Sequence, residues 1–489
     1  MAVQPPFPPP PDARTLVMKF GGTSVGTPTA MRQAAEIVQA SLAEWPRTVV
    51  ITSALSTVTN LLLDSASQAI RGDLSALYQA ESRLRQLHYA IADQLLGAGS
   101  QANDAARCSQ VKQEISHLIA NFLNLCQAVG VLGEATPRAL DAIASLGERM
   151  SARLMVAVLE GLGVPAQLVE STQLIITDNH FQSAHPDFSA TQARTRQVLE
   201  PVLARGFVPV VTGFIASTPD GATTTLGRGG SDYSAAILGA ILPAHDVWIW
   251  TDVDGVMTAD PRLVPEAHTI TSLSYREISE LAYFGAKVLH PKAIRPVIEA
   301  GVGLRICNTF NPKHPGTRLI TGSLNGTANG KSLKAVTAIR GQRMVTVEGR
   351  GMLGVPGVAA RTFGAVASTG TSVPLITQAS SEQSISFAVP QDATEPVVDA
   401  LKKVFDQELA NRDIDCIGAT GDVAIITVVG AGMIATPGIA GRIFTALGQA
   451  NINIIAIAQG SSEVAISLVV DHSEAEAAVK AIHSLIKED

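Results

Sequence analysis

The sequence is poor in cysteine, aromatic residues and charge. Its four cysteines, Cys108, Cys126, Cys307 and Cys416, show neither CxxC spacing nor clustering with the histidines. We therefore predict no disulfide framework and no bound metal. Charged residues make up 16% of the chain and the formal net charge is −7. A nucleic-acid scaffold needs a basic surface, so this balance argues against one.

A secretory signal and a membrane span are not predicted either. Residues 1–14 are rich in proline and lack a basic start and an apolar middle, so we expect a disordered tail ahead of a cytoplasmic enzyme. The longest uncharged stretch, Val423–Gly441, is long enough to span a bilayer. It is interrupted by glycines and Pro437, and a related earlier segment carries Glu348 and Arg350. We therefore predict that it is buried soluble structure.

The first three hundred residues alternate between short apolar strands and helical patterns. A strand at Thr15–Phe20 leads into the glycine turn Gly21–Gly26 and a helix over Thr29–Leu42. Further short strands are predicted at 48–52, 166–168, 208–212 and 247–251. This alternation is typical of a parallel sheet covered by helices. It ends near Ile320, where the polar, glycine-rich segment Thr321–Ser332 predicts a connector.

The last part of the chain contains an internal repeat. Val345–Val389 aligns without a gap to Ile426–Val470 at a constant spacing of 81 residues, which pairs Gln378 with Gln459. Each copy has the pattern of a strand, a Pro-Gly helix start, an amphipathic helix and two more strands. We expect two similar small α/β units with equivalent sites.

Two glycine-rich loops carry charged residues suited to phosphates or carboxylates. Lys19 and Gly21–Gly26 place an ammonium and free amides at a strand end, although a tight turn alone would explain the glycines. Arg228 and Asp232 flank a second glycine turn that opens a helix, where Asp232 also suits a helix cap. Neither loop has dinucleotide GxGxxG spacing. Residues 326–332 resemble a Walker A loop but have one residue too few between the glycines.

These motifs, in their order along the chain, resemble those of the aspartate kinases of the amino acid kinase family. The matching segments are Lys19–Gly26, Ser145–Ser151, Gly227–Tyr233, Thr251–Arg262 and Lys287–Lys292. The resemblance implies an α/β fold: a three-layer sandwich with a mostly parallel central sheet, followed by two ferredoxin-like βαββαβ ACT domains. The expected parts are a tail at 1–14, a catalytic domain at 15–320, a linker at 321–338 and ACT domains at 339–410 and 411–489.

The chemistry implied by the resemblance is phosphoryl transfer from ATP, with Mg²⁺ carried by the nucleotide, to the β-carboxylate of L-aspartate. This would be the first step toward lysine, threonine and methionine. A carboxylate is already ionised at neutral pH, so the site mainly positions groups and neutralises phosphate charge. By resemblance, Lys19 and the amides of Gly21 and Gly22 steady the phosphoryl group, while Arg228 and Glu148 hold the substrate α-carboxylate and ammonium.

The resemblance also assigns contacts around these groups. Thr59 and Ser231 would contact the substrate, Asp232 would orient Lys19 or the substrate amine, and the nucleotide would be held by Thr251, Asp252, Met257, Arg262 and Lys287. Met257 stands where many family members carry tyrosine, so an adenine contact is expected to differ.

Regulation by an amino acid is expected at Gln378 and Gln459. Their surroundings resemble the kinase half of bifunctional aspartate kinase–homoserine dehydrogenases, which favours threonine as inhibitor, with lysine as competitor. The chain stops at Asp489, so no dehydrogenase domain is expected. The resemblance implies a homo-oligomer formed through the ACT domains, without nucleic acid or membrane. Alternatives are a kinase for another acid, such as glutamate or N-acetylglutamate, and a non-catalytic amino-acid sensor.

Overall fold

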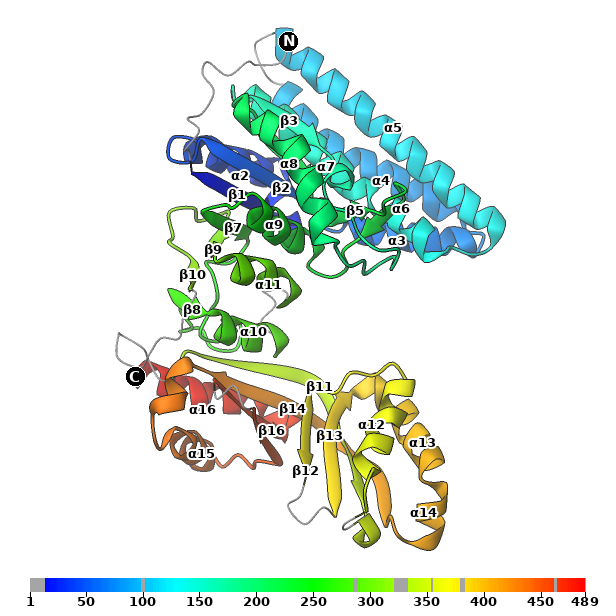
Figure 1. Ribbon diagram of the computed structural model, residues 1–489, viewed down its shortest axis with the longest axis vertical. Helices are drawn as coiled ribbons and strands as arrows, with labels where there is room; N and C mark the ends of the chain where they lie inside the picture. The colour runs from blue at the N-terminus through cyan, green and yellow to red at the C-terminus, as the bar shows by residue number, and fades with distance from the viewer. Residues whose placement is uncertain are drawn as a thin grey trace. The chain divides into compact units, whose positions relative to one another are not determined.

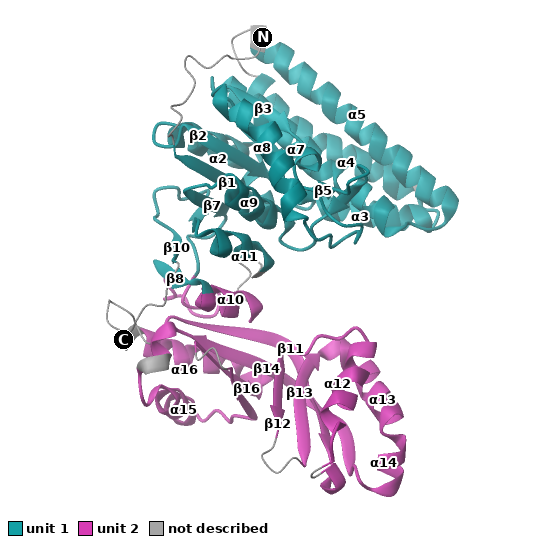
Figure 2. Ribbon diagram, in the orientation of Figure 1, with its two compact units in different colours: residues 1–256, 271–275, 288–321 teal, residues 257–270, 276–287, 322–489 magenta. Residues whose placement is uncertain are grey.

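The computed structural model forms two compact units. It describes residues 14–97, 102–284, 289, 291–320, 333–352, 355–378, 383–460 and 464–488. One unit comprises residues 1–256, 271–275 and 288–321, and the other residues 257–270, 276–287 and 322–489 (Figure 2). Each unit is described below by itself.

The first unit is built on an eight-stranded sheet with the order β3-β4-β2-β1-β7-β9-β10-β8 (Figure 1). Its strands are β1 (Thr15–Phe20), β2 (Arg47–Thr52), β3 (Ala166–Val169), β4 (Val208–Thr212), β7 (Asp246–Thr251), β8 (Ser272–Ser274), β9 (Gly303–Asn308) and β10 (Thr317–Ile320). All neighbouring strands pair in parallel except β9 and β10. A separate hairpin joins β5 (Ile215–Ser217) to β6 (Thr223–Thr225). The predicted parallel sheet is confirmed.

Helices cover both faces of this sheet. They are α1 (Gly22–Val25), α2 (Pro28–Ser41), α3 (Val58–Ile70), α4 (Leu74–Ala92), α5 (Ala102–Leu132), α6 (Pro137–Ala144), α7 (Leu146–Gly161), α8 (Phe188–Ala204), α9 (Gly230–Ile241) and α11 (Pro291–Ala300). Leu16, Met18 and Phe20 of β1 join the core formed with α2 to α5 and α7. Because side chains alternate along a strand, Lys19 faces the other way, toward α9. The result is the expected three-layer arrangement.

Helix α5 is long and apolar enough, by length and composition, to cross a membrane. Its candidate span is Asp104–Leu132, within which an 18-residue window has a mean hydropathy of 1.5. Ile115, Ile119 and Phe122 on this helix are fully buried in the core of the first unit. Only 28% of the most apolar window of this span is buried within the described structure. The segment Val423–Gly441, by contrast, forms the buried second half of a strand and the start of a helix, as predicted.

His88 on α4 makes the first unit sensitive to acid. Its ring is fully buried, Nδ1 lies 2.8 Å from the Leu84 carbonyl oxygen, and burial lowers its pKa to about 4. The unfolded chain, with an ordinary histidine pKa near 6.5, therefore binds a proton first as the pH falls. Stability is lost from about pH 6.5 down to about pH 4. We expect His88→Leu to remove on the order of 2 kcal/mol of this loss between pH 7.5 and pH 5.

Urea unfolding of wild type and His88→Leu at both pH values measures this difference. Carboxyl groups titrate equally in both proteins, so their contribution cancels in the comparison. Parallel pH dependence of the two proteins would contradict the assignment of acid sensitivity to His88.

The second unit is built on a six-stranded antiparallel sheet with the order β12-β13-β11-β14-β16-β15. Its strands are β11 (Ala335–Glu348), β12 (Leu375–Gln378), β13 (Ser384–Pro390), β14 (Cys416–Val429), β15 (Ala456–Gln459) and β16 (Ala465–Asp471). Its helices are α12 (Val358–Ser368), α13 (Thr394–Val404), α14 (Asp406–Asn411), α15 (Ile439–Gln449) and α16 (Ala475–Glu488), with α10 (Tyr275–Tyr283) joining it from Arg276 onward. The two repeats of the sequence thus form one continuous sheet.

The long strands β11 and β14 each serve both repeats. The end of β11 and the start of β14 enclose the core of the first repeat, which includes Val345 and Ile417. The start of β11 and the end of β14 enclose the core of the second, which includes Val336 and Ile426. Each repeat therefore has a ferredoxin-like strand order, but the repeats are nested. The consecutive boundaries of the sequence analysis, with residues 321–338 as linker, do not describe this packing, because Val336 is a core residue.

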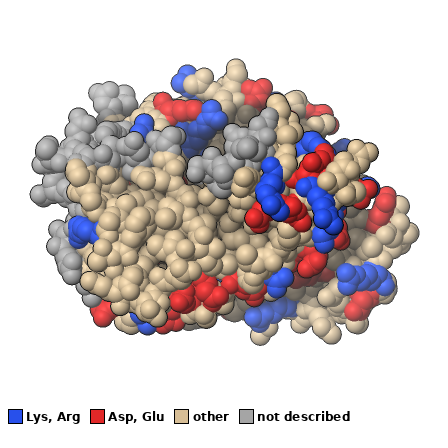
Figure 3. Space-filling view, turned by 90° about the horizontal axis from the view of Figure 1, so that it is seen from below, with Lys and Arg blue, Asp and Glu red and all other residues tan. Residues whose placement is uncertain are grey.

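Charge is distributed unevenly over the two repeats. One face of the molecule shows a broad area without charged side chains beside an area where basic and acidic side chains alternate (Figure 3). In the sequence, Arg442 is the one charged residue between Val423 and Ser462. The aligned segment of the first repeat, residues 342–381, by comparison contains Arg343, Glu348, Arg350 and Arg361. The two repeats thus share a fold but differ in surface chemistry.

Candidate active site

The glycine loop after β1 is held against the neighbouring strands. The amide of Gly21 and the hydroxyl of Ser24 both donate to the carbonyl of Trp250, at 3.1 and 3.3 Å. A Cβ atom at Gly22 would lie 2.9 Å from the carbonyl oxygen of Ala54, so this close approach requires glycine. The loop is therefore packed in place rather than being a mobile turn.

Lys19 and Asp232 form an ion pair beneath this loop. The Lys19 Nζ lies 2.6 Å from the Asp232 Oδ1, and the two side chains are 11% and 14% exposed. Asp232 sits in the first turn of α9, which the chain enters through Gly227 and Gly229 at positive φ. Holding two charges together at this depth requires each to neutralise the other. The pair places an ammonium group at the carboxyl end of the central strand.

Glu148 is a second buried carboxyl group at the site, on the first turn of α7. Its Oε1 accepts a hydrogen bond from the Ala54 amide at 3.2 Å, while its buried Oε2 has no hydrogen-bond partner among the residues that the structure describes. Loss of hydration raises the pKa of this carboxyl to about 8. Glu148 is therefore mostly protonated at pH 7, and it can pair with a cationic ligand group through Oε2 once it loses its proton.

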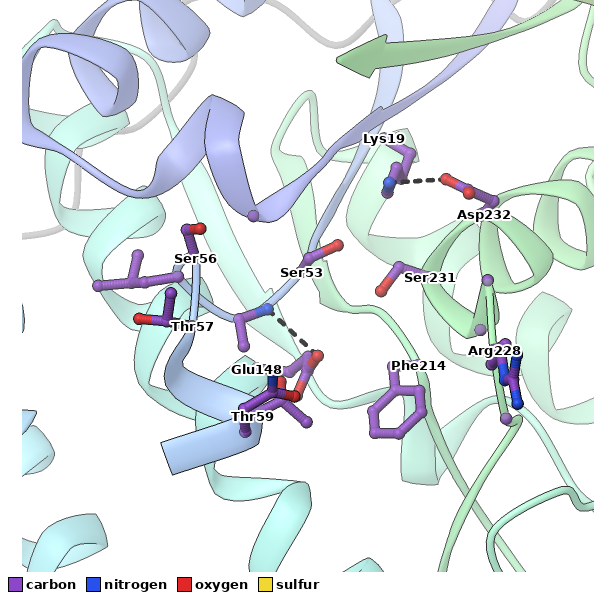
Figure 4. Close-up of a pocket in the computed structure, with 17 residues that line it drawn as sticks. Lys19, Ser53, Ser56, Thr57, Thr59, Glu148, Phe214, Arg228, Ser231 and Asp232 are labelled. Atoms are coloured by element: carbon purple, nitrogen blue, oxygen red, sulfur yellow. Dashed lines mark hydrogen bonds and ion pairs between the residues drawn. The ribbon is translucent and has the colours of Figure 1, made fainter. Parts of the chain in front are cut away.

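These side chains line one cavity of about 380 Å³. Of the residues predicted from the sequence, its lining includes Lys19, Gly22, Thr59, Glu148, Arg228, Ser231 and Asp232. Arg228 is exposed at the turn before α9, and Ser231 points its hydroxyl toward the centre of the cavity (Figure 4). Anionic and cationic groups thus face the same space from β1, α7 and the start of α9.

The cavity also contains residues that were not singled out from the sequence. They are Ser53, Ala54, Leu55, Ser56, Thr57, Asn60 and Phe214. The lining also includes Gly227, Gly229 and Gly230 of the predicted glycine turn. The Ser/Thr-rich turn at 53–59 was a visible signal, whereas nothing in the sequence marked Phe214. Thr57 and Phe214 have φ values of 71° and 65°, a conformation that side chains with a Cβ rarely adopt. Such strain is common at ligand sites, where the surrounding structure enforces it.

The structure describes all but one of the residues that the sequence predicts to bind the nucleotide. Gly21 lies beside Lys19, because a Cβ built on it would be 3.5 Å from Nζ. The hydroxyl of Thr251 donates to Asp252 at 3.2 Å, at the end of β7. In the second unit, Arg262 pairs with Asp260 at 2.6 Å, and the Met257 sulfur accepts from Thr269. Lys287 lies outside the described residues.

The two predicted regulatory glutamines end equivalent strands. Gln378 ends β12 and lines a cavity of about 410 Å³ together with Met352, Pro356 and Gly357 of the loop before α12. Gln459 ends β15 and is exposed. The equivalence of the two positions, predicted from the repeat, is thus present in the fold.

Residues 14–308 match the family model described as the amino acid kinase family. The chain belongs to the amino acid kinase family. Residues 345–405 and 426–485 each match an ACT domain, which confirms the internal repeat and the fold class.

Aspartokinases are among the relatives of this family member. A bifunctional aspartokinase/homoserine dehydrogenase 1 from Arabidopsis thaliana is 38% identical over 96% of this chain and 50% of its own length. The chain thus spans about half the length of several curated relatives. Aspartokinase 1 from the same plant is 31% identical over 96% of this chain and 79% of its own length.

The chain is also similar in structure to a solved aspartokinase. E. coli aspartokinase III, in complex with aspartate and ADP, matches 96% of this chain and 99% of its own at 30% identity, with a TM-score of 0.77. The same enzyme with lysine and aspartate gives a TM-score of 0.75.

Proposed function

We propose that the protein is an aspartate kinase, which transfers the γ-phosphoryl group of ATP to the β-carboxylate of L-aspartate and forms 4-phospho-L-aspartate. The observation that carries this proposal is the convergence of the buried Lys19–Asp232 pair, Glu148 and Arg228 on one cavity. An amino-acid substrate has a carboxylate and an ammonium at one end, and Arg228 and Glu148 complement these two charges. The relative that binds aspartate and ADP supports the same assignment.

The phosphoryl group is bound by Lys19 and the glycine loop, on the side of the cavity away from Arg228 and Glu148 (Figure 4). Lys19 neutralises charge on the transferring group, and the amide of Gly22 donates to its oxygens. The Gly21 amide, which the sequence also suggested as a donor, is already bonded to the Trp250 carbonyl at 3.1 Å. Asp232 positions the Lys19 ammonium at 2.6 Å. The reacting carboxylate is itself the nucleophile, so catalysis rests on alignment and charge neutralisation. Thr59 and Ser231 supply hydroxyl contacts to the substrate.

ATP would be bound along the loops after β1 and β7, where Thr251 and Asp252 lie at the end of β7. The family resemblance also assigns Met257, Arg262 and Lys287 to the nucleotide. The described residues contain no group of three or more His, Cys, Asp or Glu that could hold a metal ion. We therefore propose that Mg²⁺ arrives bound to the nucleotide phosphates, whose charge it neutralises during transfer.

Inhibition by an end-product amino acid is proposed at the ACT repeats, with threonine favoured and lysine as the competitor. Gln378 supports this, because its amide offers both a donor and an acceptor at the cavity of the first repeat. We expect the Gln378→Ala, Gln459→Ala variant to need about tenfold more inhibitor for half-inhibition. Inhibitor titration of kinase activity measures this, with Gln391→Ala as an exposed control in the same unit. Unchanged inhibition would contradict the role of the two glutamines.

The proposed activity is tested by ATP turnover with L-aspartate and hydroxylamine, which traps the acyl phosphate. Hydroxamate formed with aspartate, and suppressed by threonine, is the expected result. Suppression by lysine alone would retain the kinase and change its inhibitor. Product with glutamate or N-acetylglutamate instead of aspartate would support the alternative kinase, and no product from a folded, ATP-binding protein would support a sensor.

The proposal extends to the oligomeric state of the protein and its location in the cell. We propose a homo-oligomer that forms through the ACT repeats and works in the cytoplasm, without nucleic acid or membrane as partner. Size-exclusion chromatography with light scattering measures the oligomeric state.

A further inference from the structure

The second unit contains a buried ion pair that the proposed chemistry does not use. Glu277, on α10, is fully buried, and its Oε2 accepts from the Lys334 Nζ at 3.0 Å. Its Oε1 accepts from the amide of Ala431 at 2.7 Å. Lys334 directly precedes β11, and Ala431 follows β14. One carboxylate thus connects α10 to the two longest strands of the ACT sheet.

Comparison of the two repeats shows that this contact is asymmetric. The repeat spacing of 81 residues places Arg350 at the position of Ala431 and Asp415 at the position of Lys334. In the first repeat, the Asp415 carboxylate accepts a hydrogen bond from the Arg350 amide at 3.2 Å. The carboxylate that binds the loop amide therefore comes from the ACT sheet itself. Lysine cannot accept a hydrogen bond. The second repeat therefore obtains the missing carboxylate from outside, from Glu277 of α10.

Helix α10 is held to the ACT sheet at both of its ends. Near its start it is held by Glu277, and just beyond its end the carbonyl of Phe284 accepts from the Thr337 hydroxyl at 2.9 Å. In the chain, Tyr275 of α10 follows β8 of the catalytic sheet without an intervening loop. A buried charge cannot separate from its partner without a large cost, so α10 must follow any displacement of Lys334 or Ala431. Strand β14 itself runs from the first repeat directly to the loop that contains Ala431.

We propose that Glu277 couples the ACT unit to the kinase domain, by making α10 follow the loop after β14 when an amino acid binds. Glu277 is a positioning residue and has no contact with the reacting groups. The inference rests on the proposed function, because it assigns the path by which inhibition reaches the kinase. A coupling of this kind is reciprocal, so bound aspartate and bound inhibitor weaken each other by the same factor.

The test removes both charges together, so that neither is left buried alone. In the Glu277→Gln, Lys334→Met variant, we expect threonine or lysine to bind with unchanged affinity in the absence of aspartate. The factor by which saturating aspartate weakens that binding should fall from the range of about 5–150 to near 1. Calorimetric titration of the inhibitor with and without aspartate measures this factor. The control is Arg343→Gln, Asp422→Asn, which removes a half-exposed pair between β11 and β14 and should retain wild-type coupling.

Hydrogen exchange provides a second measurement that does not depend on activity. Amides of residues 275–283 should exchange faster in the variant than in wild type, whereas those of β12 and β13 should not change. Wild-type coupling in the variant, or unchanged exchange in α10, would overturn the inference. If the wild-type protein phosphorylates aspartate but neither threonine nor lysine inhibits it, the inference about Glu277 is overturned and the proposed kinase activity is retained. A wild-type protein that does not phosphorylate aspartate would instead contradict the proposed function.

Discussion

Replacing Lys19 by methionine is expected to lower kcat/KM for aspartate phosphorylation by about 10³-fold. Lys19 supplies the one positive charge that the described structure places under the glycine loop, and it lies 2.6 Å from its buried partner Asp232. Methionine keeps the apolar stem but cannot neutralise charge on the transferring phosphoryl group. Steady-state kinetics with the hydroxylamine trap measures the loss. Lys313→Met, which removes an exposed lysine of the same unit, should retain wild-type activity.

The main complication is that methionine leaves Asp232 buried without a cation. The Lys19→Met, Asp232→Asn variant removes both charges and should fold like wild type while remaining inactive. All three tryptophans lie in the first unit, where Trp45, Trp248 and Trp250 form a continuous cluster. The carbonyl of Trp250 also accepts the Gly21 amide, so tryptophan fluorescence reports the fold near the loop. A folded double variant within tenfold of wild-type activity would exclude the proposed role of Lys19.

Aspartate is expected to bind more tightly as the pH rises toward 8. Burial raises the pKa of Glu148 to about 8, so the ligand-free carboxyl must lose a proton before it can pair with the substrate ammonium. The aspartate affinity should therefore rise about tenfold per pH unit below pH 8 and level off above it. Calorimetry in buffers of different ionisation heat should show nearly one proton released per aspartate bound at pH 6.5. Affinity that does not depend on pH would contradict this role of Glu148.

The Glu148→Gln variant separates binding from stability. It should weaken aspartate binding at pH 8 on the order of 100-fold and remove the pH dependence, while ATP binding is retained.

The same change should stabilise the ligand-free protein. The raised pKa means that folding is penalised as the pH rises from about 4.5 toward 8, and glutamine removes a penalty on the order of 3 kcal/mol at pH 7. Denaturant unfolding at pH 5 and pH 7 checks the sign, since the variant should gain more stability at pH 7 than at pH 5.

Much of the site could be predicted from the sequence because its residues lie next to signals that local chemistry makes visible. Lys19 precedes a glycine turn, Arg228 and Asp232 surround another, and Glu148 belongs to a motif known from the family. Phe214 could not be predicted in this way. It lines the cavity because the backbone after β4 turns at positive φ, a conformation that no residue type at this position announces.

In the C-terminal half, the sequence revealed the repeat but not where each repeat begins and ends in the fold. The sequence repeat was visible as two consecutive copies, and both copies have the expected fold. Their boundaries were not visible, because β11 and β14 are each long enough to pair with strands of both repeats. A strand that serves two cores has the same alternating pattern as a strand that serves one.

The sequence by itself determined five of the eight strands of the first sheet, the repeat, and most of the charged groups that can serve phosphoryl transfer. These depend on periodicity, glycine turns and residue chemistry, which are local. Only the tertiary structure decided that Glu148 loses its hydration, that Lys19 meets Asp232, and that Glu277 reaches Lys334 and Ala431. The physical reason is that burial and charge pairing arise between residues far apart in the chain, and sequence spacing does not determine either one.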